Sequence, residues 1–248
     1  MPPAASTDLP RRLLAEFLGT ALLVAVIVGS GIAAQQLSPN DVGLQLLENS
    51  MATVFGLAVL ILVLGPVSGA HFNPVVSAVD HLLGRRSGVG LSAVDVGYYS
   101  VVQVAGGIVG ALLANVMFDL PLAQISTKDR LTTGHTVAEV VATAGLIVVI
   151  FALARGGRAA LSAAAVGAYI GAAYWFTSST SFANPAVAVG RIFSDTFAGI
   201  SPASVPIFVA AQVVGGAVGL VLVVLLYPDA GAAADRAVVP HRPGRRRG

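Results

Sequence analysis

The sequence predicts an all-α membrane protein in which six transmembrane helices and two Asn-Pro half-helices form an inverted repeat. Three observations support this prediction. The 248 residues are 56% hydrophobic and only 10% charged, whereas soluble domains carry about 25% charged residues. Six apolar stretches approach the length of about 20 residues that a bilayer crossing needs. An Asn-Pro pair interrupts the apolar pattern once in each half of the chain.

The predicted spans divide into two groups of three. They are expected at residues 13–34, 46–64, 94–118, 137–153, 161–176 and 204–227. The second span is expected to end near Gly65 and Pro66, because proline lacks the N–H that a helix needs. One folded domain over residues 11–228 then has halves of about 11–118 and 134–228. A cytoplasmic segment, 1–10, precedes it, and a basic cytoplasmic tail, 229–248, is expected to be disordered.

Each half also contains a short helix that begins at its Asn-Pro pair. Proline suits the first helical position, where no N–H donor is needed, and asparagine is a good N-cap. Pro74 and Pro185 therefore begin half-helices that end near residues 84 and 193, with Asn73 and Asn184 as caps. Non-helical backbone survives at membrane depth only where protein buries it or where it lines a water-filled cavity. Paired interrupted segments of this kind indicate a path for solutes.

The two halves repeat a pattern of polar and small residues. Glu16 follows an alanine in the first span, and Glu139 does the same in the fourth. Gln103 precedes a Gly-Gly pair in the third span, as Gln212 does in the sixth. Because each half contains three spans, the second half is inverted in the membrane and its half-helix meets the first near the midplane. The glycines at helical spacing indicate close helix packing rather than a flexible hinge.

Basic residues indicate which side of the membrane each loop faces. Six crossings place eleven of the 14 basic residues on the cytoplasmic side, in agreement with the positive-inside rule. The inner group is Arg11, Arg12, Arg85, Arg86, Arg155, Arg158, Arg236, Arg242, Arg245, Arg246 and Arg247, and the outer group is Lys128, Arg130 and Arg191. This sorting predicts a multi-pass membrane protein with both termini in the cytoplasm, and it forms no basic stripe for a nucleic-acid partner.

These features resemble those of the major intrinsic protein family, the aquaporins and aquaglyceroporins, over about residues 11–228. The resemblance implies an aquaporin-like channel domain, a homotetramer in the lipid bilayer, and passive transport of small uncharged solutes such as water, glycerol-like polyols, arsenous acid or other neutral metalloids. Residues 174–176 and 194–199 look like those of the bacterial branch associated with arsenic resistance, which implies a bacterial-type cell membrane. The two motifs read Asn73-Pro74-Val75 and Asn184-Pro185-Ala186, so the first departs from the usual Asn-Pro-Ala by one conservative residue.

Asn73 and Asn184 are the candidate residues of the central constriction. Each side-chain oxygen can cap its half-helix while the NH₂ group donates a hydrogen bond to a passing solute. Each helix N-terminus carries about half a positive charge, so two of them at one narrow point reject cations and protons. His71, two residues before Asn73, is expected either to line the inner mouth or to bond to a neighbouring carbonyl in its loop.

Glu16 and Glu139 lie inside apolar spans, where a charge costs at least about 2.5–3.5 kcal/mol. Each must therefore have a partner. One interpretation is a proton relay in a coupled carrier. The other is that each glutamate accepts backbone N–H groups from one half-helix loop and supports that loop. The repeat favours support, because each half has one glutamate and one loop, and the family resemblance implies the same role.

The family resemblance also implies a second constriction, a selectivity filter outside the Asn-Pro point. In the family an arginine usually follows the second Asn-Pro-Ala directly, whereas Val187 stands here. The other filter positions fall on Thr53, on Ser181, and on either Ala172 or Tyr174. Without the fixed cation and its five N–H donors, this filter is expected to be wider and less polar, which suits bulkier neutral solutes.

Arg191 follows Val187 by four residues, so it is expected about 6 Å further along the same helix face, at the outer vestibule. Two roles are open to it. Its long side chain either leans back over the filter and replaces part of the missing charge, or pairs with Asp195 and anchors the loop.

Two alternative functions use the same residues: a proton-coupled secondary carrier, and a non-conducting scaffold membrane protein of the same fold. A carrier would need unpaired carboxylates that face a cavity, for which Glu16 and Glu139 are the candidates. The sequence contains no nucleophile–base pair, phosphate-binding loop or metal-ligand spacing, and it has no cysteine. An enzyme, a metal site and a cofactor are therefore not expected.

Overall fold

The computed structural model describes residues 8–85, 88–155 and 158–227. The helical elements within these residues are α1 (Leu9–Leu37), α2 (Val42–Ser68), α3 (Pro74–Gly84), α4 (Ala93–Met117), α5 (Thr133–Arg155), the 3₁₀ turn η1 (Ala159–Leu161), α6 (Ser162–Phe176), α7 (Pro185–Gly190), the 3₁₀ turn η2 (Arg191–Phe193) and α8 (Val205–Leu226). The predicted tail, 229–248, lies outside the described residues, as do most of segment 1–10 and Arg86.

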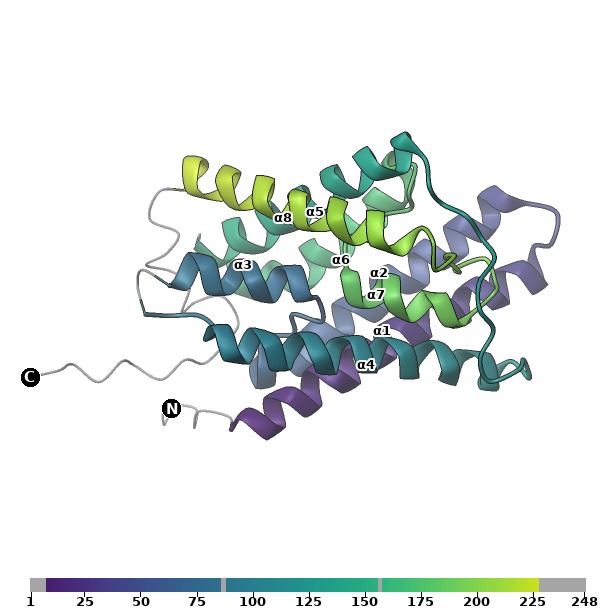
Figure 1. The fold of residues 1–248 in the computed structure, drawn as a ribbon, viewed down its shortest axis with the longest axis horizontal. Coiled ribbons are helices and arrows are strands. Elements are labelled where there is room, and N and C mark those ends of the chain that lie inside the picture. The colour runs from purple at the N-terminus through teal and green to yellow at the C-terminus, as the bar shows by residue number, and fades with distance from the viewer. Residues whose placement is uncertain (1–7, 86–87, 156–157, 228–248) are drawn as a thin grey trace, which may run out of the picture.

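Six of these elements correspond to the six predicted spans. Among the described residues, α1, α2, α4, α5 and α8 are long and apolar enough to cross a membrane. The remaining span, α6, has only 15 residues and follows η1 directly. Figure 1 shows the start of α1 and the end of α8 at the same end of the bundle, as an even number of crossings requires.

The half-helices α3 and α7 begin in the middle of the bundle and run toward opposite ends (Figure 1). Both pack against α4 and α8, and they also touch each other. The packing of α1 on α4 matches that of α5 on α8, and the packing of α1 on α2 matches that of α5 on α6. The chain therefore forms the predicted inverted repeat, in which the half-helices of the two halves meet between the long helices.

Helix pairs approach each other most closely at glycines. A Cβ atom added at Gly106 of α4 would lie 2.4 Å from the carbonyl oxygen of Phe17 in α1. In the other half, a Cβ atom at Gly215 of α8 would lie 2.5 Å from the carbonyl oxygen of Val140 in α5. A side chain at either position would force the two backbones apart. These glycines are therefore packing residues, as their spacing predicts.

Helix α2 does not end near Gly65 and Pro66, as expected, but continues to Ser68. It ends at Gly69, which adopts a left-handed conformation with a φ of 94° and donates its N–H to the carbonyl oxygen of Gly65 at 2.9 Å. Proline removes one hydrogen bond from this helix without preventing the next turn. That turn brings the hydroxyl of Ser68 to Glu16, so the extension connects α2 to the support of the first loop.

Candidate solute pore

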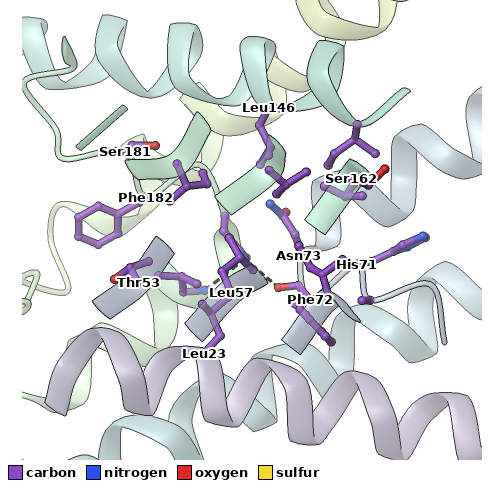
Figure 2. Close-up of a pocket in the computed structure, with 18 of the residues that line it drawn as sticks. Leu23, Thr53, Leu57, His71, Phe72, Asn73, Leu146, Ser162, Ser181 and Phe182 are labelled. Atoms are coloured by element: carbon purple, nitrogen blue, oxygen red, sulfur yellow. Dashed lines mark hydrogen bonds between the residues drawn. The ribbon is translucent and has the colours of Figure 1, made fainter. Parts of the chain in front are cut away.

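A cavity between the two halves contains both Asn-Pro points. It encloses about 960 Å³ of empty space, with open solvent at its ends included. Figure 2 shows Thr53 and Ser181 on one side of Asn73, toward the outer end, and His71 and Ser162 on the other, toward the inner end. Most of the wall is apolar and comprises Leu23, Ile27, Leu57, Ile61, Val76, Leu146, Ile150, Phe151, Val166 and Ile170. Such a wall offers no compensation for a charge that leaves water.

Asn73 and Asn184 cap the two half-helices and both line the cavity. The side-chain oxygen of Asn73 accepts from the backbone N–H of Val75 at 3.0 Å. The side-chain oxygen of Asn184 accepts from the N–H of Ala186 at 2.9 Å. Each cap satisfies a donor that the first helical turn leaves without a partner, and it directs the amide nitrogen away from its own helix.

The two amide nitrogens join the halves by a reciprocal pair of hydrogen bonds. Nδ2 of Asn73 donates to the carbonyl oxygen of Ala183 at 2.7 Å, and Nδ2 of Asn184 donates to that of Phe72 at 2.7 Å. An NH₂ group has two hydrogens, so each amide retains one after this bond. Both half-helix N-termini thus meet in the middle of the cavity, each beside a polar donor.

The two loops adopt the same unusual backbone conformation before each asparagine. Ala70 and Phe72 have φ values of 48° and 49°, and Ser181 and Ala183, at the equivalent positions, have φ values of 51° and 48°. Residues other than glycine rarely adopt this left-handed region, and such strain persists only where surrounding contacts maintain it. The contacts that maintain it come from two buried glutamates.

Glu16 is fully buried and holds the first loop. Its Oε1 accepts from the hydroxyl of Ser68 at 2.6 Å and from the backbone N–H of His71 at 3.0 Å. Its Oε2 accepts from the N–H of Phe72 at 2.7 Å and from the side-chain amide of Gln103 at 2.7 Å. Four donors therefore surround this carboxylate, and charge-assisted bonds of this kind offset its removal from water.

Glu139 holds the second loop in the same way and is also fully buried. Its Oε1 accepts from the hydroxyl of Ser179 at 2.6 Å and from the N–H of Phe182 at 2.9 Å. Its Oε2 accepts from the N–H of Ala183 at 2.9 Å and from the side-chain amide of Gln212 at 2.6 Å. The inverted repeat thus extends to individual hydrogen bonds.

Four of the predicted filter residues, Thr53, Tyr174, Ser181 and Val187, line the outer end of the cavity. The hydroxyls of Thr53 and Tyr174 are 3.2 Å apart, which is hydrogen-bond distance. Tyr174 is buried, whereas Ala172 is exposed. Of the two candidates from α6, the structure therefore brings Tyr174 to the cavity and turns Ala172 away from it.

Arg191 lines the same end of the cavity and is only 2% exposed. Its Nε donates to the carbonyl oxygen of Ala198. The central carbon of its guanidinium lies 3.6 Å from the centre of the Phe182 ring, a cation–π contact. A buried cation is thus present at the outer end, one turn away from the position of Val187.

The alternative prediction for Arg191, an ion pair with Asp195, does not occur among the described residues. Asp195 instead accepts from the backbone N–H of Thr127 at 2.8 Å. The reason is that the second half-helix is shorter than predicted: α7 ends at Gly190, the chain continues as η2, and Ser194 is extended. Asp195 therefore does not lie one helical turn beyond Arg191.

The connection between α4 and α5 packs on the segment that follows α7. Nε of Arg130 donates to the carbonyl oxygen of Gly199 at 2.8 Å, and its guanidinium carbon lies 5.1 Å from the centre of the Phe182 ring. Removal from water lowers the pKa of Arg130 to about 10 and the pKa of Lys128 to about 8. Phe182 thus has two guanidinium groups against its ring, those of Arg130 and Arg191.

At the inner end, His71 lines the cavity and its Nδ1 lies 3.0 Å from the hydroxyl of Ser77. Three further residues of the site were not predicted from the sequence. Ser68 and Ser179 donate to the two glutamates, and a serine five residues before each Asn-Pro pair is the signal that could have identified them. Asp80, which also lines the cavity, is an acidic residue seven positions after Asn73.

The sequence is similar to that of known membrane channels over most of its length. The family model described as major intrinsic protein matches residues 4–181. Aquaglyceroporin AqpS of Rhizobium meliloti is 50% identical over 215 residues, which cover 87% of this chain and 89% of that protein. Aquaporin TIP1-1 of Arabidopsis thaliana is 29% identical over 198 residues, which cover 75% of this chain and 76% of that protein.

The fold is also similar to that of a solved structure. The X-ray structure of the aquaglyceroporin from Plasmodium falciparum matches with a TM-score of 0.64 and 21% sequence identity, over 91% of this chain and 100% of that one. The chain therefore belongs to the major intrinsic protein family, whose members are multi-pass membrane channels and not enzymes.

Proposed function

We propose that this protein is a passive channel for small uncharged solutes, including water and glycerol-like polyols. The observation that supports the proposal most directly is the cavity with both asparagine amides in its middle, each retaining one N–H after its bond to the opposite loop. The similarity to AqpS, whose name describes an aquaglyceroporin, favours polyols among the solutes.

Rejection of ions follows from the same centre. The N-termini of α3 and α7 each carry about half a positive charge, and they meet where the cavity passes Asn73 and Asn184. A cation entering this point is repelled, and the apolar wall gives it no replacement for its water shell. A neutral hydroxyl group, by contrast, can accept a hydrogen bond from the free amide N–H of either asparagine.

We infer that Thr53, Tyr174, Ser181 and Val187 form the outer filter. Val187 supplies no donor and no charge at the position where the family usually has arginine. The filter should therefore admit solutes that are larger than water, such as glycerol or arsenous acid. Similarity to the bacterial branch associated with arsenic resistance supports the second of these.

We infer further that Arg191 supplies part of the missing positive charge. Its guanidinium is held by Ala198 and by the ring of Phe182, and the residue lines the cavity together with Val187. A cation set back by one helical turn leaves the filter open beside Val187 and still repels cations that approach from outside. This arrangement would combine a wide filter with ion rejection.

A proton-coupled carrier is the alternative, and the contacts of the two glutamates weigh against it. Both oxygens of Glu16 and both oxygens of Glu139 accept two hydrogen bonds each. Protonation of either would place an O–H beside a donor N–H and weaken the loop. A residue that takes up a proton in every transport cycle would not be held in this way.

The family resemblance also leads us to propose a homotetramer. Large apolar side chains are exposed on the outer faces of the bundle, among them Phe55 on α2 and Val101 on α4. Lipid or neighbouring subunits can cover such surfaces. The mass of the detergent-solubilised protein, measured by light scattering with the detergent subtracted, should be that of four chains; the mass of one chain would contradict this proposal.

Stopped-flow light scattering on proteoliposomes tests the channel function. Vesicles that contain the protein should swell in glycerol faster than empty vesicles, with no gradient of a second ion and no saturation over the measured range. An enclosed pH-sensitive dye should report no proton movement during the flux. Flux that requires a proton gradient would establish the carrier, and glycerol and water fluxes that both equal those of empty vesicles would support the scaffold.

A further inference from the structure

Asp80 lies on the cavity side of α3. Asn73, Val76 and Asp80 all line the cavity, and their spacing of three and four residues places them on one face of the helix. At a rise of 1.5 Å per residue, Asp80 is about 10 Å from Asn73 along the helix axis. Since α3 runs toward the end of the bundle where α1 begins (Figure 1), Asp80 belongs to the inner end of the cavity.

The carboxylate of Asp80 has one bonded and one free oxygen. Oδ2 accepts from the backbone N–H of Leu91 at 2.8 Å. Oδ1 is buried and has no hydrogen-bond partner among the described residues, although Asp80 is only 1% exposed. A buried charged acceptor without a partner is costly to maintain. Because Asp80 also lines the cavity, a hydrogen-bond donor that enters the cavity is a candidate for the missing partner.

Among the described residues that line the cavity, Asp80 is the one with a carboxylate, which is a stronger hydrogen-bond acceptor than a hydroxyl group. The cavity wall continues past it with Ile61, Phe151 and Ala154, which are apolar. Ser162 of α6 also lines the cavity, and it lies on the same side of Asn73 as His71 (Figure 2). A polar solute that leaves the asparagine amides therefore passes an apolar stretch before it reaches the inner solvent.

We propose that Asp80 forms an inner solute-binding site, at which Oδ1 accepts a hydrogen bond from a hydroxyl group of a neutral polyhydroxy solute. The proposal rests on the proposed channel function and adds a specificity residue to it. A carboxylate only accepts hydrogen bonds, whereas the asparagine amides offer donors to the cavity. A hydroxyl group can both donate and accept hydrogen bonds. A polyol hydroxyl would therefore accept a hydrogen bond from an asparagine amide at the centre of the cavity and then donate one to Asp80.

Asp80 has a competing role, because its bond to Leu91 also anchors the segment after α3. His81 provides the matched control. Its Nδ1 lies 2.8 Å from the carbonyl oxygen of Leu91, so it holds the same residue, but it is not among the residues that line the cavity. His81→Ala therefore weakens the anchor alone, whereas Asp80→Asn removes the charge and retains an oxygen that can accept from Leu91.

The experiment compares glycerol and water permeability of proteoliposomes with equal amounts of inserted protein. Asp80→Asn should lower glycerol permeability about tenfold, because it replaces a charge-assisted hydrogen bond by a weaker one. Water permeability should stay within about twofold, because water in a file keeps bonds to its neighbours. His81→Ala should leave the ratio of glycerol to water permeability unchanged, and Asp80→Glu, which retains the carboxylate, should keep it within about twofold.

Each result decides the proposal. An unchanged ratio in Asp80→Asn, or an equal fall in His81→Ala, would show that Asp80 serves only as an anchor. If Asp80→Asn does not insert, Asp80→Ser takes its place, since its hydroxyl can also accept from Leu91, and the same fall in the ratio is required. An unaltered protein that passes neither water nor glycerol would overturn the channel function itself, and the binding site with it.

Discussion

At the scale of single residues, each central asparagine makes several contacts with one amide group. The oxygen of Asn184 accepts from the N–H groups of Ala186 and Val187, and one hydrogen of its NH₂ group bonds to the carbonyl oxygen of Phe72. In the proposed channel, the second hydrogen is the one that a solute accepts. An amide side chain of this length combines an acceptor with two donors, whereas an aspartate of the same shape has acceptors only.

We therefore expect Asn73→Asp and Asn184→Asp each to lower glycerol permeability, by about tenfold for one lost hydrogen bond in the cavity. The new negative charge should also offset the positive half-helix ends and increase the leak of cations. Light scattering measures the first effect, and potassium leak from the same vesicles measures the second. Inserted variants that conduct like the parent would show that the asparagines are only helix caps.

Val187 and Arg191 test the outer filter at the same scale. Val187→Arg should narrow the opening and reduce the flux of glycerol or arsenous acid more than that of water. Arg191→Ala should increase permeability to large solutes and relax the rejection of cations, because it removes the buried cation that lines this end of the cavity. Permeability to a series of polyols of increasing length gives the size limit of each variant.

The two variants are informative together. If Arg191 only anchors the outer segment through Ala198, Arg191→Ala should leave the order of solute permeabilities unchanged. If Val187→Arg has no effect on large solutes while Arg191→Ala increases their flux, the filter does not lie at Val187.

At the scale of elements, the loop before each half-helix depends on one glutamate of the same half. Glu16→Gln replaces an acceptor oxygen by an NH₂ group that faces donors such as the N–H of Phe72. We expect this change, or Glu139→Gln, to destabilise the protein by about 1–3 kcal/mol and to lower its midpoint of thermal unfolding in detergent. Glu48→Gln, a half-buried glutamate at the other end of α2, should have a smaller effect. Proton uptake that accompanies solute flux and disappears in Glu16→Gln would instead reveal a carrier.

The contact of α4 with α1 provides a second test at this scale. A Cβ atom at Gly110 would lie 2.1 Å from the carbonyl oxygen of Ala21, whereas one at Gly97, in the same helix, would have nothing within 4 Å. Gly110→Ala should therefore separate the helices and lower the midpoint of thermal unfolding. Gly97→Ala should leave it unchanged or raise it, because alanine favours a helix by up to about 1 kcal/mol over glycine. Equal effects of the two changes would contradict close packing at Gly110.

At the scale of the whole molecule, the inverted repeat requires the ends of the described chain to lie on one side of the membrane. The absence of cysteine from the sequence allows a direct test by single cysteine substitutions. Leu122→Cys, exposed in the connection between α4 and α5, should react with a membrane-impermeant maleimide on intact cells. Arg158→Cys, exposed before α6, should react only after the cells are opened. The reverse pattern would mean that the charge rule assigns the wrong orientation.

Most of the fold could be predicted because its determinants are local. A run of apolar residues defines a span whatever it packs against, and an Asn-Pro pair begins a helix by its own chemistry. The ends of the elements were less predictable. Helix α2 passes Pro66, and α7 ends at Gly190, because contacts from distant segments decide whether a further turn is stabilised.

The membrane class, the six spans and the two half-helices follow from the sequence alone, as do the polar residues that need partners in an apolar chain: Asn73, Asn184, Glu16 and Glu139. The packing of the helices was needed to show that Tyr174 rather than Ala172 lines the cavity and that Arg191 contacts Phe182 and not Asp195. It was also needed to show that the amides bond to the opposite loops and that Oδ1 of Asp80 has no hydrogen-bond partner among the described residues. The physical reason is that apolarity and capping are properties of short segments. The direction of a side chain depends on how its helix is rotated, and that rotation is fixed by contacts between residues more than 100 positions apart.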